Sequence, residues 1–178
     1  MNIAVYCSSR SALPEHYKQL AIALGTWLGE QGHTLVYGGS NAGLMHITAQ
    51  AVKQAGGHIV GVIPEFFRHL ADPLVDELIV TTDMIDRKQR MIALAHHFVV
   101  LPGGLGTIEE WLTTLSHFTA TADYGHRIVV ANPDGIYDHM SQQILATCQS
   151  PMAHGRPLDI VRYVTTAEQL LAELQELS

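Results

Sequence analysis

The sequence predicts an α/β fold built on a doubly wound parallel sheet with helices on both faces. Short apolar, β-branched runs alternate along the chain with longer segments of helical character, which is typical of parallel sheets. The runs IVGVIP (59–64) and VVLP (99–102) are apolar on both faces, as in strands that helices cover on both sides. Ligands of such sheets bind at the carboxyl ends of the strands, so the strand-to-helix turns are where a site is expected.

The expected helices and strands follow from local sequence patterns. The first helix is bounded by Pro14, which suits a helix start, and by Gly32, which favours a helix end. The last helix shows leucines at helical spacing. Strands are expected at Ile3–Cys7, Thr34–Tyr37, His58–Ile63, Glu77–Thr81, His97–Leu101, Arg127–Ala131 and Ile160–Val164. Helices are expected at Pro14–Gln31, Gly43–Ala55, Met84–Ala95, Thr107–Thr119, Ile136–Cys148 and Ala167–Leu177.

Length and composition indicate one globular domain over residues 1–178. The chain has 178 residues, of which 47% are hydrophobic and 15% charged, and this excludes a disordered or fibrous chain. No apolar run approaches the ~18 residues of a membrane span, and the N-terminus lacks the basic region of a signal peptide. The two cysteines, Cys7 and Cys148, suit a reducing compartment as buried thiols, so a cytoplasmic location without membrane contact is expected.

The charge balance argues against nucleic acid as a partner. Ten basic and seventeen acidic residues give a formal net charge of −7, whereas nucleic-acid binders usually carry a basic surface. A local cationic pocket remains compatible with this balance.

Two glycine-rich turns are the first candidate binding elements. One lies at 37–43 (YGGSNAG) and the other at 101–107 (LPGGLGT), each between an expected strand and a helix. Glycine lets the backbone approach a ligand, and a helix N-terminus offers free N–H groups, so each turn predicts an anion site, most often for phosphate. The alternative is a tight turn that requires positive φ. The candidate binding residues are Gly38, Gly39, Ser40, Gly43, Gly103, Gly104, Gly106 and Thr107.

Neither turn matches a familiar nucleotide motif. There is no G-x-G-x-x-G after the first strand, which ends in Cys7-Ser8-Ser9-Arg10, and no Gly-Lys-Ser/Thr of a P-loop. A ligand smaller than NAD, and bound differently from ATP, is therefore expected.

Arg87 and Lys88 stand near the start of a helix that Asp83 is expected to cap. Cations at this end oppose the helix dipole, which points to a role in binding phosphate or a developing negative charge. The alternative is that Asp83–Arg87 and Asp86–Arg90 form i,i+4 surface pairs.

Two carboxylates, Glu109 and Glu110, follow the second glycine turn. Thr107 and Glu110 fit a capping box, with Thr107 as N-cap. The alternative is functional: a carboxylate here would position water or stabilise an oxocarbenium-like centre, as in glycoside hydrolysis.

These motifs together resemble the Lonely Guy (LOG) family, often labelled "possible lysine decarboxylase". The segment PGGLGTIEE at 102–110 resembles the family's P-G-G-x-G-T-x-x-E. It is accompanied by Arg87-Lys88, by YGGSNAGLM at 37–45, by GVIP at 61–64 and by N-x-x-G-x-Y-D at 132–138. The joint presence of the upstream Arg-Lys and the glycine motif is highly specific.

The resemblance implies a Rossmann-like fold, a homodimer and an enzyme without a cofactor. The implied activity is hydrolysis of the N-glycosidic bond of a nucleoside 5′-monophosphate, AMP or an N6-modified cytokinin nucleotide, to free base and ribose 5-phosphate. By position, Arg87 and Glu110 match the family's catalytic pair. The residues that match its substrate-binding stretch are Lys88, Gly103, Gly104, Gly106, Thr107 and Glu109; Ser116, which keeps a hydroxyl, is expected to join them.

Three histidines depart from the family pattern. His46 stands where glycine is usual, His69 where many members have glutamate, and His117 in a segment that replaces the usual Thr-Trp. We expect these side chains to line the pocket as polar groups rather than to bind a metal.

Two other functions are considered. Decarboxylation with pyridoxal phosphate needs a Schiff-base lysine, and of Lys18, Lys53 and Lys88 only the last is expected near the site. A non-catalytic nucleotide-binding or carrier protein would keep the phosphate turns without hydrolysing anything.

Overall fold

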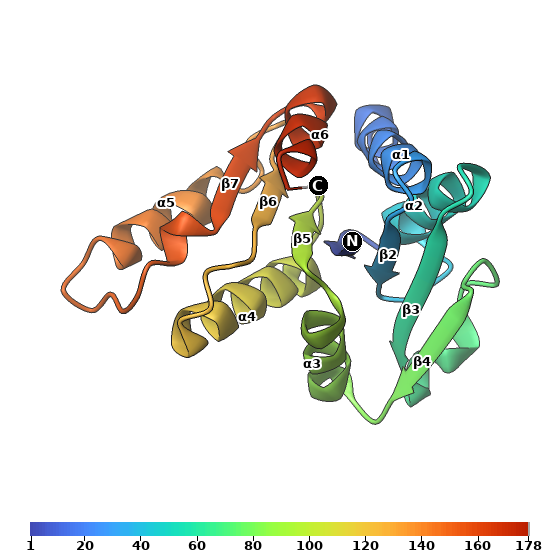
Figure 1. Cartoon of the computed structure of the whole chain (residues 1–178), viewed down its shortest axis with the longest axis horizontal. Helices are drawn as coiled ribbons and strands as arrows, with labels where there is room; N and C mark the ends of the chain where they lie inside the picture. Colours follow the sequence, from blue (N-terminus) through green and yellow to red (C-terminus); the bar gives the residue numbers. More distant parts are fainter. Residues whose placement is uncertain (178) are drawn as a thin grey trace.

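In the computed structural model, which describes residues 1–177, seven strands form one sheet in the order β4-β3-β2-β1-β5-β6-β7 (Figure 1). All neighbouring strands are parallel, which confirms the predicted sheet. The strands are β1 (Asn2–Tyr6), β2 (Thr34–Tyr37), β3 (His58–Pro64), β4 (Glu77–Thr81), β5 (His97–Val100), β6 (Ile128–Ala131) and β7 (Val161–Val164).

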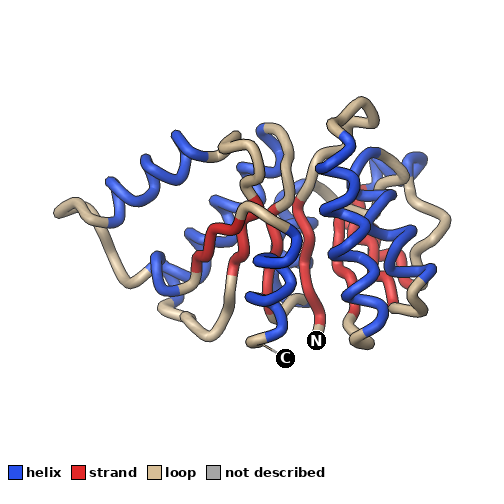
Figure 2. Tube along the Cα trace, turned by 90° about the horizontal axis from the view of Figure 1, so that it is seen from above, coloured by secondary structure: helices blue, strands red, loops and turns tan. Residues whose placement is uncertain are grey.

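Helices cover both faces of the sheet, as predicted. They are α1 (Glu15–Glu30), α2 (Gly43–Gln54), α3 (Met84–Leu94), α4 (Leu105–Thr121), α5 (Asp138–Cys148) and α6 (Ala167–Gln175). The core on one face is built with α1, α2 and α6, and the core on the other with α3, α4 and α5. Figure 2 shows the strands running side by side between these helices.

Alternation along the central strand explains the two cores. Ile3 and Val5 of β1 pack into the first core, whereas Ala4 and Tyr6 pack into the second. Because both faces of the strand are covered, every one of these side chains is buried. This is why the apolar runs in the sequence show no polar alternation.

Two 3₁₀ helices were not predicted. They are η1 (Glu65–Leu70) and η2 (Pro157–Asp159). η1 spans six residues and η2 three, too few for helical periodicity, which is read over a window of about 11–18 residues.

The order of the strands creates a switch point beside β1. The chain runs from β1 outward through β2, β3 and β4, and then returns to place β5 on the other side of β1. Crevices at the carboxyl ends of the strands at such a point are where α/β folds bind ligands. Over residues 1–177, no helix has both the length and the apolar character needed to cross a membrane.

Candidate functional site

Three turns meet at the switch point. They are the turn after β1 (residues 7–10), the first glycine turn (37–43) and the second glycine turn (101–107). Ser8 joins them, because its N–H donates to the carbonyl of Pro102 at 3.2 Å and its carbonyl accepts from the N–H of Leu44 at 2.9 Å. The backbone around the site is therefore hydrogen-bonded across all three turns.

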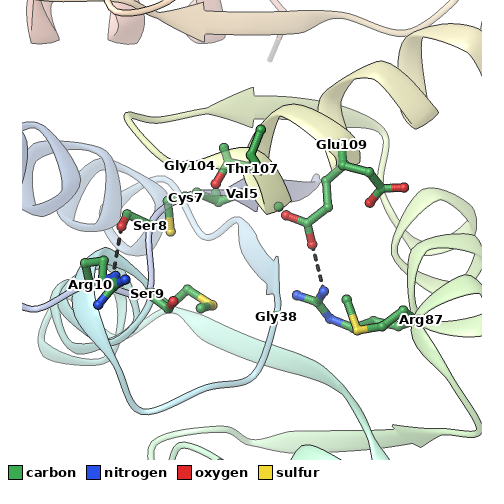
Figure 3. A pocket seen from close by; sticks show the side chains of 15 residues that line it. Val5, Cys7, Ser8, Ser9, Arg10, Gly38, Arg87, Gly104, Thr107 and Glu109 are labelled. Atoms are coloured by element: carbon green, nitrogen blue, oxygen red, sulfur yellow. Dashed lines mark hydrogen bonds and ion pairs between the residues drawn. The ribbon is translucent and has the colours of Figure 1, made fainter.

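A cleft of about 390 Å³ opens between these turns, a volume that suits a small-molecule ligand (Figure 3). Its walls come from β1 and the turn after it, from the two glycine turns, and from the N-terminal parts of α2, α3 and α4. The lining residues are Val5, Cys7, Ser8, Ser9, Arg10, Gly38, Met45, Met84, Arg87, Gly104, Leu105, Gly106, Thr107, Glu109 and Glu110.

Arg87 and Glu110 form a buried ion pair at one side of the cleft. Arg87 Nη1 lies 2.9 Å from Glu110 Oε1, and the two side chains are only 11% and 9% exposed. Arg87 Nε also donates to the carbonyl of Val62 at 3.0 Å, which fixes the guanidinium against β3. Helices α3 and α4 thus place a rigid cation next to a buried carboxylate.

Burial raises the pKa of Glu110 above its ordinary value, and the positive charge of Arg87 opposes part of that rise. Oε1 of Glu110 is itself buried and lies against the guanidinium of Arg87, so this oxygen is engaged in the pair rather than open to the cleft.

The start of α3 has the predicted N-cap, Asp83, but Arg87 in its first turn has a partner that was not predicted. Asp83 caps the helix, accepting hydrogen bonds from the N–H groups of Ile85 at 2.8 Å and Asp86 at 2.9 Å. The surface pair of Asp86 with Arg90 is present at 3.4 Å. The alternative pair of Asp83 with Arg87 is not formed, because Arg87 turns inward to Glu110.

The predicted capping box of α4 is also wrong. The helix begins at Leu105 with Gly104 as its N-cap, and no side chain caps it. Thr107 packs over Gly103 instead, so closely that a Cβ on Gly103 would lie 2.1 Å from the threonine hydroxyl oxygen. Glu110, in turn, is drawn to Arg87 rather than back to the helix start.

The glycines of the two turns serve different purposes. A Cβ on Gly38 would lie 2.2 Å from Arg87 Nη2, so Gly38 makes room for the guanidinium. A Cβ on Gly104 or Gly106 would meet nothing within 4 Å. Since both line the cleft, their backbone is open to a ligand there.

Some predicted binding residues lie away from the cleft. Lys88 does not line the cleft, but it forms an ion pair with Glu109, which does line it. Gly39 and Gly43, with φ of +69° and +55°, shape the first turn without lining the cleft. Ser40 lines a smaller apolar hollow beside it.

Ser116 lies elsewhere, in a groove between α4 and α5. The expectation that His46, His69 and His117 line the pocket is wrong, since none of them lines the cleft or the adjoining hollow. His46 instead pairs with the buried Asp72 at 2.8 Å. Across residues 1–177, no three His, Cys, Asp or Glu side chains are placed to hold a metal ion.

The turn that follows β1 also belongs to the site, and its residues were not predicted from the sequence. Ser8, Ser9 and Arg10 line the cleft, although this turn contains no glycine. Its position could have been predicted from topology alone, because the turn after the first strand lies at the switch point of a doubly wound sheet.

The N-x-x-G-x-Y-D segment supports the second glycine turn. The hydroxyl of Tyr137 donates to the carbonyl of Leu101 at 2.9 Å and lies 3.4 Å from that of Gly103. Asn132 in turn accepts from the N–H of Tyr137 at 2.9 Å and donates to Asp138 at 2.6 Å. These residues act on the turn and do not line the cleft.

None of the three lysines lines the cleft. Lys18 pairs with Glu15, Lys53 with Asp76 and Lys88 with Glu109. The arrangement therefore offers no free amine for a Schiff base.

Comparison with known proteins identifies relatives of this chain. A family model described as "Possible lysine decarboxylase" matches residues 45–174. The cytokinin riboside 5′-monophosphate phosphoribohydrolase LOG7 of Arabidopsis thaliana is 34% identical over 98% of this chain and 81% of its own. The rice enzyme LOG (Oryza sativa subsp. japonica), of the same printed activity, is 33% identical over 98% of this chain and 72% of its own.

A solved structure shares the fold. The molybdenum cofactor binding protein of Rippkaea orientalis superposes with a TM-score of 0.78 over 99% of this chain and 96% of its own. The two sequences are 23% identical, so this similarity concerns the architecture alone.

Proposed function

The chain belongs to the LOG family, described as "possible lysine decarboxylase", and on this premise we propose that it is a nucleoside 5′-monophosphate phosphoribohydrolase. The substrate would be AMP or an N6-modified AMP such as a cytokinin nucleotide, and the products free base and ribose 5-phosphate. The observation that most supports this proposal is the buried pair of Arg87 and Glu110 in a cleft between two glycine turns.

The cleft offers contacts that suit two parts of such a substrate, the phosphate and the sugar carbon that bears the base. The free N–H groups at the start of α4, open at Gly104 and Gly106, suit the phosphate. Glu110 would face the anomeric carbon, where positive charge develops as the bond to the base breaks. Arg87 would hold the carboxylate in place, and Lys88 would do the same for Glu109.

In the proposed reaction, the C1′–N bond breaks and its electron pair leaves with the base, which takes up a proton. A water oxygen bonds to C1′ and loses a proton. Glu110 stabilises the oxocarbenium-like centre and orients the water through its carboxylate, while Arg87 holds Oε1 of that carboxylate. No cofactor is required for these steps.

Decarboxylation of lysine fits the site less well. A pyridoxal enzyme needs a lysine to hold the cofactor, and the only lysine close to the cleft is paired with Glu109. An absorbance band of bound pyridoxal phosphate would contradict this assignment.

We also propose that the protein acts as a homodimer, as the family resemblance implies. The groove between α4 and α5, which carries exposed Met152 at its rim, offers apolar surface for such contact. Light scattering of the purified protein should give twice the mass of the chain, and a monomer at micromolar concentration would contradict the proposal.

The activity is tested with AMP and N6-isopentenyladenosine monophosphate, separating free base by chromatography. Wild type should release base, and Glu110→Gln should lower turnover by about 100-fold or more while AMP still binds. Binding of AMP without base release by wild type would favour the carrier function instead. Unchanged turnover in Glu110→Gln would remove the proposed role of this residue.

A further inference from the structure

The cleft has one cation without a partner. Its charged lining residues are Arg10, Arg87, Glu109 and Glu110. Arg87 is paired with Glu110, and Glu109 with Lys88. Within residues 1–177, the guanidinium of Arg10 takes part in no hydrogen bond or ion pair, and only its backbone N–H is engaged.

Charge balance makes this cation important for an anionic ligand. The two arginines and two glutamates that line the cleft sum to zero formal charge. Lys88 balances Glu109 from outside the lining, as Arg87 balances Glu110, so removing Arg10 would leave no excess positive charge to attract a phosphate dianion. Arg87 cannot offset this, because its charge is already balanced by the carboxylate 2.9 Å away.

The backbone that carries Arg10 is held in place. Its N–H donates to the hydroxyl of Ser8 at 3.1 Å, and Ser8 is bonded to both glycine turns. Gly43 packs against the same turn: a Cβ there would lie 2.5 Å from the carbonyl oxygen of Arg10. The side chain of Arg10 therefore extends from a fixed point at the edge of the cleft.

The position of Arg10 also indicates how a nucleotide would be oriented in the cleft. Figure 3 shows Arg10 on the opposite side of the cleft from Arg87, with Gly104, the N-cap of α4, and Thr107 of α4 bordering the space between them. A phosphate at the Arg10 side would lie beside the open backbone of Gly104 and Gly106. The sugar attached to it would then extend toward Glu110.

We infer that Arg10 is a further substrate-binding residue, whose guanidinium recognises the 5′-phosphate of the nucleotide. The inference rests on the proposed function and makes it more specific: phosphate recognition is assigned to Arg10 rather than to Arg87 and Lys88. Arginine suits this task, since its guanidinium can donate two parallel N–H groups to phosphate oxygens.

The test compares AMP with adenosine, which lacks the phosphate, in wild type, Arg10→Gln and Arg10→Lys. Calorimetry gives the Kd of each compound, and base release gives kcat/KM. Arg10→Gln should lower the preference for AMP over adenosine by about 10- to 100-fold, the range expected for one charged hydrogen-bonded contact. Arg10→Lys should keep part of that preference. Arg90→Gln is the matched control, because it removes the same charge outside the cleft, where Arg90 pairs with Asp86.

The outcomes separate the inference from the proposed function. If wild type binds AMP more tightly than adenosine but releases no base, the function fails, and the Kd values still decide the role of Arg10. If wild type hydrolyses AMP and Arg10→Gln keeps the full preference for it, Arg10 is not the phosphate ligand. An equal loss in Arg90→Gln, or no preference for AMP in wild type, would also overturn the inference.

Discussion

At the scale of single residues, the environment of Glu110 sets the pH at which the site can work. Its carboxyl must be ionised to stabilise positive charge, and burial raises its pKa above the ordinary value for glutamate. Activity should therefore be lost as pH falls through a pKa above about 4.3. A profile of kcat against pH measures this acid limb.

The control for that profile is Glu109→Gln. The negative charge of Glu109 helps to raise the pKa of Glu110, so Glu109→Gln should keep the acid limb and move it toward lower pH. A limb that disappears in Glu109→Gln, or one in wild type at the ordinary glutamate pKa, would contradict the assignment to Glu110.

His46 is a second residue whose partner makes a prediction possible. Its ring Nδ1 lies 2.8 Å from a carboxylate oxygen of Asp72, a side chain that is fully buried. His46→Ala removes this partner and should lower the free energy of unfolding by about 1–2 kcal/mol, because the buried carboxylate of Asp72 loses a hydrogen-bond partner. Chemical denaturation measures the loss. His69→Ala, at an exposed position of η1, should change it by less than about 0.5 kcal/mol; equal losses in the two variants would show that the pair is not stabilising.

At the scale of elements, the two glycine turns should respond differently to an added methyl group. Gly38→Ala places a Cβ against the guanidinium of Arg87, so it should displace Arg87 and lower kcat. Gly104→Ala meets no protein atom within 4 Å, so it should keep the wild-type Tm and raise KM by filling the cleft. Thermal unfolding and steady-state kinetics distinguish the two, and a lowered Tm in Gly104→Ala would contradict the open backbone.

The elements also show what sequence alone could predict. The strands and helices were found to within a few residues, because long apolar runs and glycine or proline boundaries determine them locally. The start of α4 was placed wrongly, since Thr107 packs on Gly103 and leaves Gly104 to begin the helix. The pairing of Arg87 with Glu110 could not be derived from spacing, because it depends on how α3 and α4 lie across the sheet.

At the scale of the whole molecule, acid should weaken the fold from the end of the sheet opposite the cleft. His97, at the start of β5, accepts a hydrogen bond from the N–H of Arg127 at 3.1 Å through Nδ1, which requires a neutral ring. Its pKa is lowered to about 4, first by burial and then by the neighbouring charges of His126, His96 and Arg127. Its contribution to stability is thus complete above the unfolded pKa of about 6.5 and is lost as pH falls toward 4.

We expect the free energy of unfolding to fall by about 1–2 kcal/mol over that pH range on account of His97, since solvent screens part of the effect. Denaturation of wild type and His97→Gln at several pH values measures it. The variant should show a smaller fall, and parallel curves for the two proteins would indicate that another group is responsible.

The hydrogen bond from the hydroxyl of Tyr137 to the second glycine turn matters for any attempt to transfer this site to another protein. The second glycine turn keeps its shape partly because a side chain from the segment before α5 donates to its carbonyls, and Asn132 holds that side chain's backbone. The shape of the second glycine turn therefore depends on residues outside its own sequence. A designer who transfers residues 101–107 to another α/β scaffold must therefore transfer Asn132 and Tyr137 as well. A sequence search with the short glycine motif alone will also find proteins that lack these two supporting residues.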